Sequence, residues 1–118
     1  MPKVNMDLLP FTIAVDFDGC LVSQEWPKIG EKNHELFSLI KHYKKLGFRI
    51  ILWTCRVGKM LDEAVEYCVC HGVEFDAVNC NIPEVQEMFG HDTRKVWAHI
   101  YIDDKNIIPP LPWKEDKK

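Results

Sequence analysis

The chain has 118 residues, 47% of them hydrophobic and 28% charged, which is typical of one globular domain. We expect a single domain over residues 1–118, with a core from about 11 to 106 and a proline-rich tail over 107–118. The formal net charge of −3 implies no general attraction to nucleic acid. No stretch is long enough to cross a membrane, and the N-terminal residues lack the apolar segment of a signal peptide. Five cysteines without the spacing of a zinc site or a redox pair favour reduced thiols and a cytoplasmic location.

The hydrophobic pattern of the first half alternates between strand and helix. A continuous apolar run predicts a buried strand over residues 11–17, and helical spacing predicts a helix from about 31 to 46. A second buried strand is expected over 48–53, followed by a second helix from about 59 to 71. That second helix should turn Leu61, Ala64, Val65 and Cys68 toward the core.

The second half continues the alternation with shorter elements. We expect a strand over 75–78, a polar connection with one helical turn, and a last strand over 98–102. The tail should be extended, with Trp113 against the body, because its prolines exclude a helix interior or a central strand. Such β-α-β alternation predicts an α/β fold with a doubly wound, Rossmann-like parallel sheet, whose ligands bind at the carboxyl ends of the strands.

Polar side chains follow each predicted strand, so all of them should lie at that one edge. Four carboxylates in one place repel one another unless a cation neutralises them, and oxygen ligands suit a hard ion such as Mg²⁺. A hydroxyl and a lysine at the same edge would serve the oxygens of a phosphoryl group. The residues are Asp16 and Asp18 after the first strand, Thr54 and Arg56 after the second, Asn79 and Asn81 after the third, and Asp103 and Asp104 after the fourth, with Lys95 shortly before it.

These motifs resemble those of the haloacid dehalogenase superfamily, in particular its magnesium-dependent phosphatases. The resemblance covers residues 12 to about 106 and rests on four motifs in the family's order. It implies a sheet of strand order 3-2-1-4. The motifs are Asp16-Phe17-Asp18-Gly19, Ile50-Ile51-Leu52-Trp53-Thr54, Lys95, and Ile102-Asp103-Asp104.

The resemblance assigns a role to each acidic residue. Asp16 is the expected nucleophile, which forms an aspartyl-phosphate, and Asp18 is the expected general acid and base. Mg²⁺ is expected on Asp16, on the backbone carbonyl of Asp18 and on Asp103, with Asp104 behind these ligands. An acid at position 18 excludes the dehalogenase reaction, whose branch of the family lacks it.

The resemblance also assigns phosphate-binding roles to Thr54 and Lys95. Arg94 is the alternative to Lys95, which is favoured by its distance from Asp103. Cys20 departs from the pattern because many relatives carry Thr there, so a thiol replaces a stronger hydrogen-bonding group. Overall the chain looks closest to small members of unassigned substrate with the pair Lys105-Asn106 after the last acids.

No cap domain is expected, because only the short segments 20–30 and 80–93 are available for one. An open site implies a large substrate with a protruding phosphate, or closure by a partner subunit in a homo-oligomer. Lys28, Arg56, Lys59 and Trp26 are candidates for contacts with substrate at the rim.

We therefore predict a Mg²⁺-dependent phosphomonoesterase with a phosphorylated substrate of open identity. A catalytically silent binding or scaffold module of the same fold is one alternative, although none of the expected acids is missing. A phosphoacceptor receiver domain is another, and the order of motifs argues against it. Receivers carry the phosphoacceptor Asp after the third strand, where this chain has Val78-Asn79.

Overall fold

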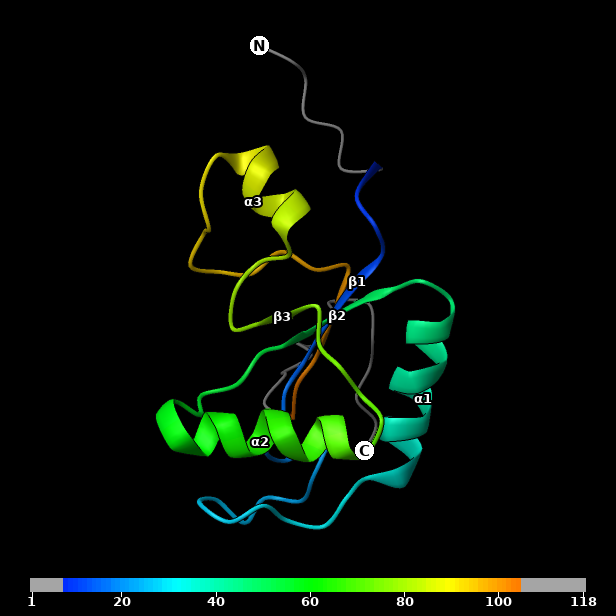
Figure 1. Cartoon of the computed structure of the whole chain (residues 1–118), viewed down its shortest axis with the longest axis vertical. Coiled ribbons are helices and arrows are strands. Elements are labelled where there is room, and N and C mark those ends of the chain that lie inside the picture. The colour runs from blue at the N-terminus through cyan, green and yellow to red at the C-terminus, as the bar shows by residue number, and fades with distance from the viewer. Residues whose placement is uncertain (1–7, 105–118) are drawn as a thin grey trace, which may run out of the picture.

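The computed structural model describes residues 8–104, which form a parallel sheet with helices on both faces (Figure 1). The expected tail, Trp113 and the pair Lys105-Asn106 lie outside these residues. No helix in this part of the chain has the length and apolar character needed to cross a membrane. The elements are β1 (Thr12–Val15), α1 (His34–Lys45), β2 (Arg49–Leu52), α2 (Gly58–Cys70), β3 (Ala77–Val78), α3 (Pro83–Phe89) and β4 (Ile100–Ile102).

The sheet has the order β3-β2-β1-β4, and all its pairs are parallel, as predicted. Strand β1 lies between β2 and β4, so Ala14 is opposite Ile51 on one side and Tyr101 on the other. The pairing extends past the end of β1, where the Asp16 amide donates to the Ile102 carbonyl at 2.9 Å. The strand order changes direction at β1, which is the position where ligands bind in open α/β sheets.

Alternate side chains of the central strands enter two separate cores. Ile13 and Val15 of β1 face α1 and α2, whereas Ala14 faces the opposite core, to which α3 contributes. The two layers of helices explain why the strands are apolar on both faces. The inward positions predicted for α2 are confirmed, because Leu61, Ala64, Val65 and Cys68 all belong to the first core.

Capping residues explain where the helices differ from the sequence prediction. Helix α1 begins at His34, three residues later than expected, because Asn33 caps it by accepting from the Leu36 amide at 3.1 Å. Helix α3 has seven residues where one turn was expected. Pro83 starts it without losing a needed donor, and Gly90 ends it in a left-handed conformation with φ of 83°.

Asn81 fastens the segment between α3 and β4 from a fully buried position. Its side-chain nitrogen donates to the Asp92 carboxylate at 2.9 Å and to the Thr93 hydroxyl at 3.0 Å. Its side-chain oxygen accepts from the Trp97 amide at 2.6 Å. Because these partners precede β4 along the chain, Asn81 helps to place the strand that carries Asp103.

Substitution of Asn81 by alanine should destabilise the protein by about 2 kcal/mol, because the Trp97 amide and the Asp92 carboxylate lose a buried partner. Urea unfolding followed by circular dichroism measures the change. Glu87→Ala, at an exposed position of α3, is the matched control and should change stability by less than about 0.5 kcal/mol. Equal stability of the two variants would contradict the structural role of Asn81.

Candidate functional site

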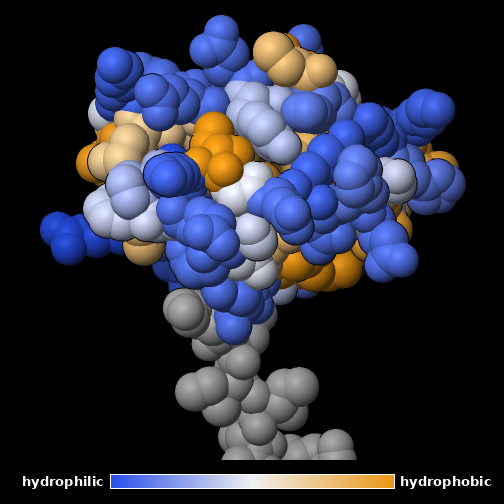
Figure 2. Space-filling model, turned by 90° about the horizontal axis from the view of Figure 1, so that it is seen from below, coloured by the Kyte–Doolittle hydropathy of each residue, from blue (hydrophilic) through white to orange (hydrophobic). Residues whose placement is uncertain are grey.

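A cavity of about 430 Å³ opens at the carboxyl ends of β1, β2 and β4. Figure 2 shows this end of the molecule, whose surface is mainly hydrophilic with scattered apolar side chains. Of the segments predicted to meet here, those that follow β1, β2 and β4 line the cavity, whereas Asn79 and Asn81 after β3 do not. The cavity is lined by four carboxylates, Asp16, Asp18, Asp103 and Asp104, together with Gln24, Trp26, Thr54 and Cys55.

Asp16 follows β1 directly and is only partly exposed. Its carboxylate accepts from the Phe17 amide at 2.7 Å, which fixes the side chain toward the cavity. Burial, followed by the charges of Asp103, Asp104 and Asp18, raises the pKa of Asp16 to about 6. The carboxylate therefore lies in an environment that disfavours its negative charge unless positive charge is supplied.

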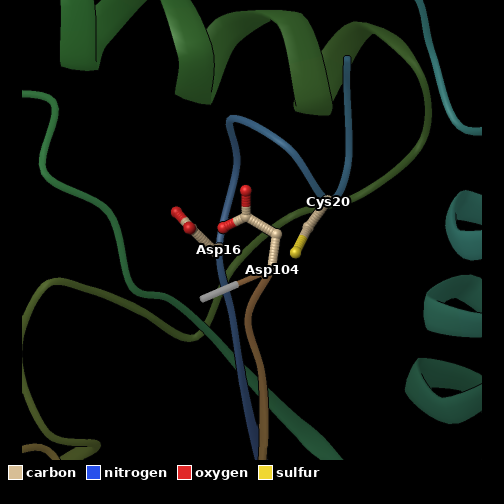
Figure 3. A group of neighbouring side chains, drawn as sticks. All are labelled: Asp16, Cys20 and Asp104. Atoms are coloured by element: carbon tan, nitrogen blue, oxygen red, sulfur yellow. The ribbon is translucent and has the colours of Figure 1, made fainter. Parts of the chain in front are cut away.

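Asp104 and Cys20 approach Asp16 closely, and Figure 3 shows the two carboxylates side by side with the thiol next to them. Ligand atoms of the three residues all lie within 4.8 Å of one another. Gly19 makes this approach possible, because a Cβ there would collide with the Asp104 carboxylate and its φ of 85° favours glycine.

The donor set at this point suits a hard cation. Asp16 and Asp104 offer carboxylate oxygens, and the Asp103 carboxylate lines the same cavity. The Cys20 thiol is a poor ligand, because burial and the neighbouring carboxylates raise its pKa to about 11. Its sulfur lies 3.9 Å from the Ile102 carbonyl, to which it donates. The sequence placed Asp104 behind the metal ligands, whereas the structure brings its carboxylate to that of Asp16.

Asp18 is held by a bidentate ion pair with Arg56. The Arg56 Nε donates to one carboxylate oxygen at 2.8 Å, and Nη2 donates to the other at 2.7 Å. This pairing raises the pKa of Arg56, which therefore stays charged. Asp18 thus remains part of the cavity wall while its charge is balanced from behind.

The predicted place of Arg56 at the exposed rim is wrong, because only 1% of the residue is exposed. Its guanidinium lies over the Phe17 ring at 5.0 Å and donates to the carbonyls of Pro27 and Lys28. The sequence showed an arginine two residues after Thr54 but carried no signal of the folded loop that buries it.

Thr54 follows β2 and lines the cavity as predicted. Its amide donates to the Asn79 side chain at 2.8 Å, and its hydroxyl accepts from the Arg56 amide at 3.1 Å. Asn79, to which no role was assigned, has a φ of 54° that a short polar side chain tolerates. Its side chain thereby fixes the turn that presents Thr54.

Of the remaining predicted residues, only Trp26 lines the same cavity as the carboxylates. Trp26 lines the cavity and is 57% exposed. Lys28 and Lys59 are exposed but do not line it. The Lys95 amine lies 5.5 Å from the centre of the Tyr101 ring, and the residue lines a different cavity beside α3. The phosphate-binding role of Lys95, or of the exposed Arg94, stays a prediction.

A search among solved structures gives a match to a conserved protein from Bacteroides thetaiotaomicron. The two chains are 41% identical, with 86% of this chain and 84% of the other covered and a TM-score of 0.74. This chain belongs to the same family as that protein. The match shows a shared fold but assigns no activity. No family model and no curated protein matches the chain.

Replacing Asp16 by asparagine should stabilise the metal-free protein at pH 7.5, raising Tm by about 4 °C. The folded-state pKa lies above the unfolded value of 3.8, so wild type loses stability as pH rises from about 4 to about 6. The variant lacks this loss and keeps an acceptor for the Phe17 amide.

Thermal unfolding in chelator at pH 4 and pH 7.5 measures the effect. At pH 4 the two proteins should melt within about 1 °C of each other, because Asp16 is then largely protonated. Glu87→Gln, exposed on α3, is the control and should show no such pH-dependent difference. A variant less stable than wild type at pH 7.5 would contradict the unfavourable environment of Asp16.

Proposed function

We propose that this chain is a Mg²⁺-dependent phosphomonoesterase of the haloacid dehalogenase superfamily. The observation that carries the proposal is the gathering of Asp16, Asp18, Asp103 and Asp104 around one cavity with Thr54. No lysine, arginine or histidine lines this cavity in the part of the chain that the structure describes. An anionic phosphate would be repelled from such a cavity, so its binding there requires a cation.

The metal would be held by Asp16, the backbone carbonyl of Asp18 and Asp103, with Asp104 close enough to Asp16 to contribute. When bound, Mg²⁺ supplies the positive charge that neutralises the carboxylates and the phosphate oxygens. Oxygen donors favour this ion over softer metals, and the protonated Cys20 thiol does not compete.

The reaction proceeds in two displacements at phosphorus. In the first, a carboxylate oxygen of Asp16 forms the new bond to phosphorus while the bond to the leaving oxygen breaks. Asp18, which enters this step protonated at an oxygen lone pair that Arg56 does not use, gives the leaving oxygen that proton. In the second, water attacks the aspartyl-phosphate and passes a proton to Asp18, which releases inorganic phosphate and restores the Asp16 carboxylate. The Thr54 hydroxyl, which accepts from the Arg56 amide, would donate its own hydrogen to a phosphoryl oxygen at the cavity wall, whereas the Thr54 amide is taken by Asn79.

The substrate is a phosphate monoester that reaches an open cavity, since no cap domain covers it in the described part of the chain. Either the substrate is large and exposes its phosphate, or a second copy of the chain closes the cavity. We place the enzyme in the cytoplasm, and its five cysteines, all free thiols in the structure, fit that reducing compartment.

Hydrolysis of p-nitrophenyl phosphate tests the function. Wild type should require Mg²⁺, and Asp16→Asn should lower kcat by roughly 10³-fold or more, because the nucleophile is lost. Mg²⁺ should also raise the Tm of wild type much more than that of Asp16→Asn, since the metal loses a charged ligand. The exposed variant Glu87→Gln should retain wild-type kcat and wild-type stabilisation by Mg²⁺.

Two measurements distinguish the competing functions: the amount of phosphoprotein trapped by acid quenching and the number of turnovers. An enzyme gives a labile phosphoprotein and many turnovers, whereas a receiver domain gives the phosphoprotein with at most a few. A silent module binds Mg²⁺ but gives neither product. Activity independent of Mg²⁺, or retained in Asp16→Asn, would contradict the proposed mechanism.

Trp26 should contribute to binding the organic part of an aromatic substrate, because it is an exposed ring on the cavity wall. Trp26→Ala should raise KM for p-nitrophenyl phosphate by roughly fivefold and leave kcat within about twofold. Glycerol phosphate, which has no ring to stack, serves as the control substrate and should show an unchanged KM. An equal rise in KM for both substrates would argue against stacking.

A further inference from the structure

Arg56 is the largest fully buried side chain among the described residues, and it contacts Asp18 from the side of the protein interior. A buried guanidinium is costly unless its hydrogen bonds are satisfied, and here they are. Its Nε and Nη2 donate to the two oxygens of Asp18, Nη2 donates also to the Lys28 carbonyl, and Nη1 donates to the Pro27 carbonyl. The protein thus keeps the buried charge of Arg56 next to Asp18, the carboxylate to which the proposed reaction assigns proton transfer.

We propose that Arg56 is a positioning residue for Asp18, which it holds in the orientation needed to pass a proton to the leaving oxygen. This inference rests on the proposed function, because it assigns a task within that reaction. It also replaces the contact with substrate that the sequence predicted for Arg56.

The geometry of the pair explains how one side chain can orient another. Two parallel N–H···O bonds of 2.8 and 2.7 Å fix the plane of the Asp18 carboxylate, which a single bond could not. Each carboxylate oxygen has a second lone pair, so the cavity side remains available for a proton. Asp18 lines the cavity with a side chain 13% exposed, whereas the Arg56 side chain is 0% exposed.

The same guanidinium also ties the loop after β1 to this carboxylate. Its bonds to the carbonyls of Pro27 and Lys28, at 3.2 and 3.0 Å, hold the segment that begins beyond Trp26. Arg56 therefore links the wall that carries Trp26 to the residue that transfers the proton. A lysine could not reproduce this arrangement, because it offers a point charge without the planar fork of nitrogens.

The experiment compares two substrates in a double-mutant cycle of Asp18→Asn and Arg56→Lys. An alkyl phosphate such as glycerol phosphate needs a proton on its leaving oxygen, whereas p-nitrophenolate leaves as an anion. We expect Asp18→Asn to lower kcat for glycerol phosphate by roughly 10²-fold or more and for p-nitrophenyl phosphate much less. Arg56→Lys should lower kcat for glycerol phosphate by roughly 10- to 100-fold with KM unchanged, and for p-nitrophenyl phosphate by less than about fivefold.

The double variant tests whether Arg56 acts through Asp18. Because the orientation of an absent acid cannot matter, Arg56→Lys should lower kcat by less than about twofold in the Asp18→Asn background. Arg49→Lys is the matched control, since Arg49 makes a similar bidentate pair with Glu84 at 3.0 and 2.6 Å, between β2 and α3. It should leave the kcat ratio of the two substrates unchanged.

Each remaining outcome decides against a specific claim. Equal loss of kcat on both substrates in Arg56→Lys, or losses that add to those of Asp18→Asn, would show a purely structural role and overturn the inference alone. A wild type that hydrolyses neither substrate with Mg²⁺ overturns the proposed function and the inference together.

If Arg56→Lys does not fold, Asp18→Asn is compared with Asp18→Asn/Arg56→Met, in which neither member of the pair is left as an unpaired charge. Equal kcat then supports the inference, and a further loss of more than about tenfold overturns it.

Discussion

The pairing of β1 with β4 is the contact on which the candidate site depends. Val15 lies opposite Ile102, and the Asp16 amide continues the pairing by donating to the Ile102 carbonyl. Residues 87 positions apart in the sequence, Asp16 and Asp103, thereby lie at one end of the sheet. Helices pack on opposite faces of the sheet, and within the described residues a cavity opens at these strand ends. The topology thereby concentrates four carboxylates around one cavity, which in the proposed enzyme would admit a cation and the substrate.

The structure balances the charges of this edge in two different ways. Arg56 pairs with Asp18 from within the protein, and each of its three guanidinium nitrogens donates a hydrogen bond. Asp16 has no such cation in the described chain, and its environment disfavours the ionised form. Asp18 therefore has a fixed partner within the protein, whereas Asp16 would have to be neutralised by a bound cation. In the proposed enzyme, this difference leaves the Asp16 carboxylate available to the metal, while the Asp18 side chain is held by Arg56.

The sequence predicted features that depend on periodicity and strand order, and it missed those that depend on side-chain approach. Apolar runs followed by acids identified β1, β4 and their shared edge, and Ala64 and Cys68 followed from helical spacing. The burial of Arg56 could not be predicted, because it depends on a loop whose carbonyls come from residues 27 and 28. The position of Asp104 beside Asp16 likewise depends on a missing side chain at Gly19. Asn33 and Gly90 belong to residue types that commonly cap helices, and they fix the start of α1 and the end of α3.

In the proposed enzyme, the loop after β1 would connect substrate contact to proton transfer. Ser23 and Glu31 close this loop through two hydrogen bonds, and Arg56 anchors it from below at Pro27 and Lys28. The loop brings Trp26 to the cavity, and the next two residues, Pro27 and Lys28, accept from the same guanidinium that binds Asp18. A change in the loop would therefore reach the proton carrier through one shared side chain, without a separate hinge or lid. Substrate preference and proton transfer are then expected to change together when this loop varies among members of the family.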